Sequence, residues 1–76
     1  MGTVTKIKTI AGVFSVAPQT LRFLEGVTGK TGSDAVEHFV TVCLEAFLDP
    51  KHVIAKFNKD IIDIDDLVKI AELVDG

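Results

Sequence analysis

The fold is decided by the stretch SDAVEHFVTVCLEAFL, which covers residues 33–48. Apolar side chains recur in this stretch every three or four residues, which is the repeat of a helix that buries one face. These side chains are Val36, Phe39, Val40, Cys43, Leu44, Phe47 and Leu48. Ser33, followed by Asp34, is a suitable N-cap and first turn, and Pro50 ends or redirects the helix. The pattern therefore predicts a central amphipathic helix that presents one broad apolar stripe to a core.

The sequence after Pro50 predicts two further helical segments. Val53, Ile54 and Phe57 have helical spacing, so we expect a short helical segment that ends before a connection at residues 58–60. Asp63 is then expected to cap a last helix, with Asp66 three residues further on. The inner face of that helix would hold Ile64, Leu67, Val68, Ala71 and Val74.

The sequence before residue 33 predicts an extended segment followed by a short helix. Residues 3–10 are rich in β-branched side chains, which favour a strand or arm. Gly12 and residues 15–18 break this pattern, and Pro18 suits the first turn of a helix over residues 19–25 that Gly26 stops. Residues 26–32 contain three glycines and predict a loop.

Together these segments predict a mainly α fold. We expect one small domain over residues 1–76, with an extended arm or strand at 1–17 and a helical core at 18–76. Three to four helices would pack into a small bundle.

The apolar content is high for so short a chain. Hydrophobic residues make up 47% of the 76 residues, and the mean hydropathy is +0.39. Because a small domain has much surface for its volume, some apolar surface should remain exposed and serve a partner protein or a homo-oligomer. The side chains expected to be left over, and so to bind protein, are Phe14, Val16, Leu21 and Phe23.

Several classes of partner are disfavoured by composition. The net charge of −3 provides no clustered basic patch for a nucleic acid. The longest charge-free run lies between Lys8 and Arg22, which is shorter than the roughly 20 residues that a membrane-spanning helix needs. Cys43 is the single cysteine, so an intramolecular disulfide is excluded, and a reducing, cytoplasmic location is expected.

Three residue groups resemble chemical sites without meeting their requirements. Residues 26–31 contain Gly-Lys-Thr, but a phosphate-binding loop needs a further glycine where Leu24 stands. The aspartates of residues 60–66 lack the central glycine and closing glutamate of a calcium loop. His38, Cys43 and His52 could supply a nucleophile and base or metal ligands, yet Cys43 falls on the apolar stripe and His38 on the polar side. We therefore expect no enzyme activity, metal or cofactor.

Ser33 raises one further alternative, because it precedes an amphipathic helix in an acidic chain of carrier-protein length. Acyl carrier proteins attach a phosphopantetheine arm to a serine that follows an aspartate and precedes a leucine. Here Ser33 follows Gly32 and precedes Asp34. An acyl-carrier-like protein stays open as a second alternative.

Residues 36–75 resemble the small tail assembly chaperones of tailed bacteriophages. The resemblance rests on the apolar stretch 39–48, the Asp49-Pro50-Lys51 step, the acidic connection and the helix that begins near Asp65-Asp66-Leu67. It implies a non-catalytic helical protein that coats a tape measure protein in the host cytoplasm during tail assembly. A small homodimeric adaptor or structural interaction domain would explain the same apolar surplus and is the first alternative.

Overall fold

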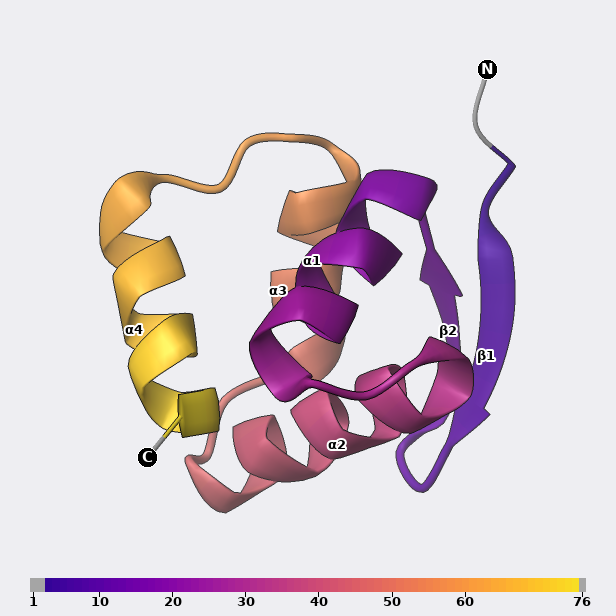
Figure 1. The fold of residues 1–76 in the computed structure, drawn as a ribbon, viewed down its shortest axis with the longest axis horizontal. Helices are drawn as coiled ribbons and strands as arrows, with labels where there is room; N and C mark the ends of the chain where they lie inside the picture. Colours follow the sequence, from indigo (N-terminus) through magenta and orange to yellow (C-terminus); the bar gives the residue numbers. More distant parts are fainter. Residues whose placement is uncertain (1–2, 76) are drawn as a thin grey trace.

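The computed structural model describes residues 3–75 and has a mainly α fold, as the sequence predicts. An N-terminal two-stranded hairpin precedes four helices in this part of the chain (Figure 1). The elements are β1 (Thr5–Thr9), β2 (Gly12–Val16), α1 (Pro18–Thr28), α2 (Gly32–Glu45), α3 (Pro50–Asn58) and α4 (Ile64–Asp75). No helix within residues 3–75 combines the length and the apolar content that crossing a membrane requires.

The hairpin replaces the single strand or arm that the sequence predicted. β1 and β2 run antiparallel, with Ile7 opposite Phe14, and residues 10–11 form the turn. The Thr9 hydroxyl donates to the Gly12 carbonyl at 2.9 Å and accepts from the Ala11 amide at 3.1 Å, which closes the turn. Gly12 has a φ of 109°, so it begins β2 in a conformation that favours glycine. The first strand therefore does end before Gly12, as the sequence predicts, but the sequence did not predict that residues 12–16 form a second strand paired with it.

The ends of α1 and the start of α2 also differ from the prediction. α1 continues through Gly26 to Thr28 and is ended by Gly29, which is left-handed with a φ of 71°. The predicted N-cap at Ser33 is wrong, because α2 begins at Gly32. The Glu25 carboxylate accepts a hydrogen bond from the Gly32 amide at 2.8 Å, so an acidic side chain of α1 satisfies a donor at the start of α2.

The later helices start with the caps that the sequence indicates. The Asp49 carboxylate accepts from the Lys51 amide at 3.1 Å at the start of α3. The predicted cap at Asp63 is confirmed, since its carboxylate accepts from the Asp66 amide at 3.1 Å. Both carboxylates satisfy amide donors that have no partner inside the first helical turn.

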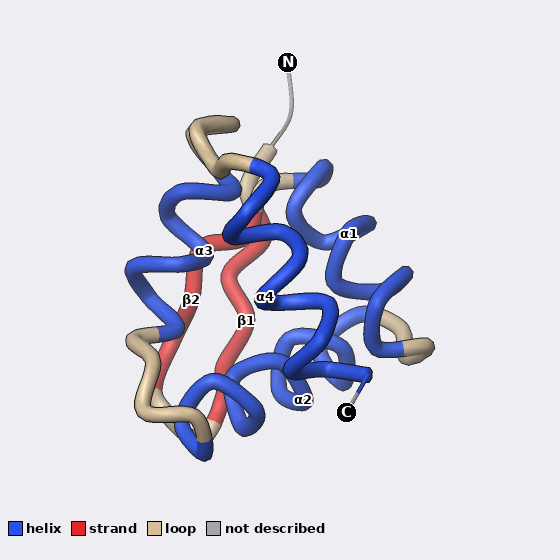
Figure 2. Tube along the Cα trace, turned by 90° about the vertical axis from the view of Figure 1, so that its left-hand side faces the viewer, coloured by secondary structure: helices blue, strands red, loops and turns tan. Residues whose placement is uncertain are grey.

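Helices α1, α2 and α3 lie between the hairpin and α4, which occupy opposite ends of the molecule (Figure 1). The side view agrees, because α4 is in front and the hairpin behind (Figure 2). The core joins the inner face of the hairpin to the middle helices and is centred on Val16, Leu24, Phe39, Val40 and Ile54. Within residues 64–74, Ile70 alone is buried, so α4 is the helix with the thinnest attachment to the core. The predicted inner face of this helix is therefore wrong for Ile64, Val68 and Ala71, which are exposed, whereas Leu67 and Val74 do pack against the core.

Asn58, the last residue of α3, joins three parts of the fold. Its Oδ1 accepts hydrogen bonds from the Ala17 amide at 2.9 Å and from the Thr20 hydroxyl at 2.8 Å. Its Nδ2 donates to the Ser15 carbonyl at 2.7 Å. One amide side chain thus fixes the passage from β2 to α1 against the end of α3.

Candidate functional site

The four side chains predicted to bind a protein are not the exposed apolar groups of the structure. Phe14 and Val16 are 3% and 0% exposed, so the expectation that they are left over is wrong. The reason is the hairpin, whose alternating side chains direct Phe14 and Val16 into the core. Leu21 and Phe23 are half-buried and pack against the core, and the Phe23 ring lies 4.6 Å from that of Phe57.

The residue groups that resemble chemical sites are dispersed or already engaged. Cys43 is 1% exposed, and burial raises the pKa of its thiol from 9.0 to about 11, so a reactive thiolate is disfavoured at neutral pH. Asp63 caps α4, and an Asp66 carboxylate oxygen lies 3.5 Å from the Lys56 ammonium. Across the described residues, no three His, Cys, Asp or Glu side chains gather in a way that would hold a metal ion.

Exposed large apolar side chains concentrate instead at the end of α2 and along α4, with a second group on the hairpin. We define the corner surface as Leu44, Phe47, Leu48 and Leu73, which come from the last turn of α2, the α2–α3 connection and the last turn of α4. The four side chains are all more than a third exposed. Leu48 and Leu73 line one hollow together with Ala46, so the two segments form a continuous surface.

The backbone that builds the corner surface is a helix-ending motif with an unusual residue at its centre. The Leu48 amide donates to the Cys43 carbonyl at 2.8 Å and the Phe47 amide to the Leu44 carbonyl at 3.1 Å, the pair of bonds that closes a Schellman turn. Phe47 occupies the left-handed position with a φ of 60°. Glycine is the usual residue there, because a side chain in this conformation costs roughly 1–2 kcal/mol.

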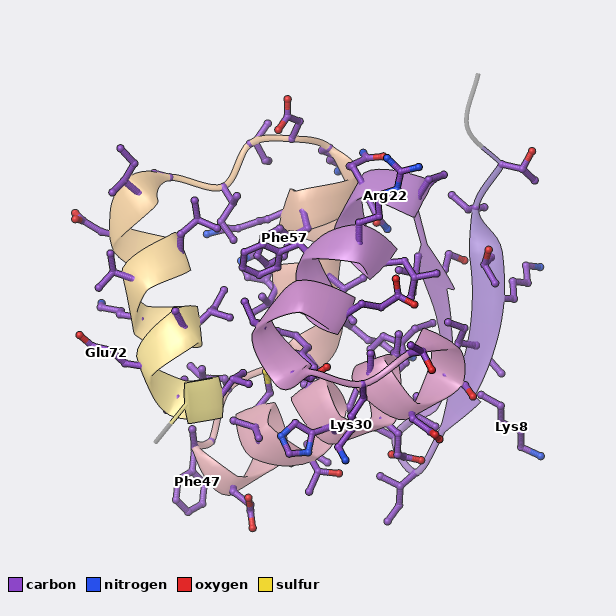
Figure 3. All side chains as sticks on the ribbon, in the orientation of Figure 1. Lys8, Arg22, Lys30, Phe47, Phe57 and Glu72 are labelled. Carbon is purple, nitrogen blue, oxygen red and sulfur yellow. The ribbon has the colours of Figure 1, made fainter. Side chains whose placement is uncertain are left out.

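Phe47 is 97% exposed, and its ring points away from the rest of the molecule (Figure 3). A fully buried phenylalanine would contribute about 1.5–3 kcal/mol, a gain that this side chain does not make within the chain. Phe47 therefore combines a strained backbone with an unburied aromatic ring. Neither property stabilises the fold.

The corner surface is flanked by hollows on both sides of Leu73. One is lined by Ala46, Leu48, Lys69, Glu72 and Leu73. The other is lined by His38, Val42, Glu45, Ala46, Leu73 and Val74. Both lie between α4 and the end of α2, so an inserted apolar side chain would contact both helices.

The corner surface has a negative electrostatic character. α2 and α4 end close together there, and neither has a basic residue in its last turn. Helix C-termini carry a partial negative charge of about half a unit, which a basic side chain commonly balances. Glu45 and Glu72 are exposed and line the two hollows, with Lys69 as a neighbouring cation. An apolar ligand with a positive charge beside it would suit this surface.

The corner surface was not predicted from the sequence, because Phe47 and Leu48 continue the helical repeat of residues 36–44 and were therefore assigned to the buried face of the central helix. The structure ends α2 at Glu45, so the predicted continuation of the central helix to Leu48 is wrong. The available signal was Pro50, because the residue before a proline avoids the helical conformation and the last turn must close earlier.

Comparison of the chain with protein-family models, with curated proteins and with solved structures found no match. The candidate site therefore rests on the geometry described above.

Proposed function

We propose that this protein is a non-catalytic binding domain that holds an apolar segment of a partner protein at the corner surface. The observation that carries the proposal is Phe47, an aromatic side chain that is 97% exposed on a left-handed backbone. Aromatic side chains dominate the binding energy of many protein interfaces, particularly where neighbouring pockets exclude water. The hollows beside Leu73 supply such neighbours.

The partner segment is proposed to be an amphipathic helix with a basic residue near its apolar anchor. An apolar side chain of that helix would enter the hollow between Leu48 and Leu73 and pack against Phe47. A lysine or arginine beside it would approach Glu45, Glu72 and the free carbonyls at the helix ends.

We further propose that the protein acts as a tail assembly chaperone and that its partner is a tape measure protein. This finer assignment is supported by the resemblance of residues 36–75 to that family. The same residues include most of α2 and all of α3 and α4, the helices around the corner surface. A chaperone that coats a long partner requires accessible apolar surface rather than an enclosed catalytic pocket.

The test is capture of partners from the source cells by the tagged chain, with Phe47→Ser as the variant and Ile10→Ser as the matched control. Ile10 is also a large exposed apolar residue, but it lies in the hairpin turn. We expect the wild type and Ile10→Ser to retain one long helical protein. Phe47→Ser should weaken its binding about 30-fold, as loss of an interface anchor worth about 2 kcal/mol would do.

Intact mass of the captured chain is measured in the same experiment. Equal retention of the partner by Phe47→Ser and the wild type would refute binding at the corner surface. A mass increase on the chain that disappears in Ser33→Ala would instead support the acyl-carrier-like alternative. Recovery of the chain's own dimer alone would favour the adaptor alternative.

A further inference from the structure

The charges of this chain are divided unequally between its two halves. Residues 1–30 carry four basic side chains and one acidic side chain, whereas residues 31–76 carry four basic and ten acidic side chains. The hairpin belongs to the first half and α4 to the second. These elements lie at opposite ends of the fold (Figure 1). The strands of the hairpin carry Lys6 and Lys8 and no acidic residue, although Glu37 of α2 accepts a hydrogen bond from the amide of Ile10 in the turn. We call the hairpin the basic end and α4, which carries Asp65, Asp66 and Glu72 with Lys69, the acidic end.

The basic end is the outer face of the hairpin, which we define by Lys6, Lys8, Val13 and Ser15 and call the hairpin face. All four residues are exposed, and the strand register places Lys6 opposite Ser15 and Lys8 opposite Val13. The Lys8 side chain extends away from the rest of the protein (Figure 3). The hairpin face thus combines the apolar side chain of Val13, directly opposite Lys8, with two neighbouring ammonium groups.

The acidic end is the outer side of α4, which we define by Ile64, Asp65, Val68 and Glu72 and call the α4 face. All four are exposed, and Ile64 is 75% exposed. Their helical spacing places them on the side opposite Ile70, the buried residue of the helix. Glu72 points away from the body of the protein (Figure 3). Lys69 lies beside this face, toward the corner surface.

The two faces have complementary chemistry but cannot meet within one chain. The protein measures 31 Å along its longest axis, and the hairpin and α4 lie at the two ends of that axis (Figure 1). Contact between them therefore requires a second copy. Asp65 and Glu72 are about 10 Å apart along the helix and Lys6 and Lys8 about 7 Å apart along the strand, a difference that the long lysine side chains can span.

We infer that this protein associates head to tail, with the hairpin face of one copy against the α4 face of the next. Val13 packs on Ile64 and Val68, while Lys6 and Lys8 approach Asp65 and Glu72. Because the two faces differ, each added copy leaves one face of each kind free, and the contact propagates into a row of copies. The four apolar side chains of the corner surface take no part in this contact. Glu72 is shared, because it also lines a hollow beside Leu73, so Lys6→Glu with Lys8→Glu is the variant that tests the contact without changing the proposed partner site.

Charge reversal of each face distinguishes head-to-tail association from a symmetric dimer. Lys6→Glu with Lys8→Glu makes both ends acidic, and Asp65→Lys with Glu72→Lys makes both ends basic. Each double variant alone should stay monomeric where the wild type assembles. An equimolar mixture should assemble again, because every basic face then finds an acidic one on the other variant.

The measurement is sedimentation velocity over roughly 10 μM to 1 mM, the range expected for a small and weak interface. The wild type should exceed the 8.2 kDa monomer mass progressively, and added salt should reverse the increase. Far-UV circular dichroism checks that each variant is folded. Phe47→Ser is the control, and it should assemble as the wild type does.

Three results on the wild type and the charge variants would overturn the inference. They are a wild type that stays monomeric throughout, double variants that assemble as the wild type does, and a mixture that fails to restore assembly. Loss of assembly in Phe47→Ser would move self-association to the corner surface and would equally contradict it.

Discussion

Replacing Asn58 by alanine should remove a large part of the stability of this protein. The change deletes the acceptor of the Ala17 amide and the Thr20 hydroxyl and the donor to the Ser15 carbonyl. Each such hydrogen bond contributes about 1 kcal/mol net. Thr20 is 0% exposed, so its hydroxyl cannot turn to water instead. We expect a loss of about 3 kcal/mol, against a total of roughly 4–11 kcal/mol for a domain of this size.

The assay is urea unfolding followed by circular dichroism, because the chain has no tryptophan or tyrosine for fluorescence. With a slope of about 1 kcal/mol per molar urea, the midpoint should fall by about 3 M or the variant should be unfolded without denaturant. Thr20→Val provides the second arm of a double-mutant cycle, and its coupling to Asn58→Ala should be about 1 kcal/mol. Lys59→Ala, at an exposed neighbouring position, is the control.

A midpoint of Asn58→Ala within experimental error of the wild type would refute the reasoning. It would mean that water or a shifted backbone replaces all of the lost bonds. A zero coupling to Thr20→Val would show that the Thr20 hydroxyl is not stabilised by Asn58.

The remaining predictions concern helix ends and the buried thiol. Gly29→Ala should lower the free energy of unfolding by about 1 kcal/mol, because Gly29 is left-handed. Gly26→Ala should raise the free energy of unfolding by about 0.5–1 kcal/mol, because Gly26 lies within α1 and a Cβ added there would have no atom within 4 Å. Phe47→Gly should raise it by about 0.5 kcal/mol, since the relief of backbone strain exceeds the entropy of a new glycine. All three are measured by urea unfolding, and a reversed order of the Gly26 and Gly29 variants would contradict the helix boundaries. Because burial raises the pKa of Cys43 from 9.0 to about 11, the unfolded chain loses the thiol proton first. Stability should therefore hold below pH 9 and fall by about 3 kcal/mol between these two values. Cys43→Ala should lack this component of the alkaline loss, and an identical pH profile for both proteins would refute it.

The helical segments could be predicted from sequence because their information is local. The repeat of Val36, Phe39, Val40 and Cys43 encodes the buried face of α2, and all four side chains are buried in the structure. Asp63 was recognisable as a cap because a carboxylate before a helix satisfies the first free amides.

The hairpin was missed because its evidence is not local. Residues 5–9 show no clean apolar face, and only pairing with residues 12–16 reveals that Ile7, Phe14 and Val16 share one side. Because the hairpin was missed, the predicted protein-binding site was also wrong: Phe14 and Val16 were assigned to an exposed arm but are buried in the core. The hydrogen bonds of Asn58 could not be predicted for a similar reason, because its partners lie about 40 residues away in the sequence.

The three helix ends of this protein show why the corner surface is a functional candidate rather than a by-product of folding. α1, α2 and α3 are each followed by a left-handed residue, which is Gly29, Phe47 or Asp60. Gly29 meets this need without strain, and aspartate is among the residues that tolerate the conformation best. Phe47 alone brings a bulky side chain to such a position and then leaves it in solvent. Glycine would close α2 equally well, so the fold does not require phenylalanine at this position. A role in contact with another molecule supplies the missing reason, and it places that contact at the end of α2.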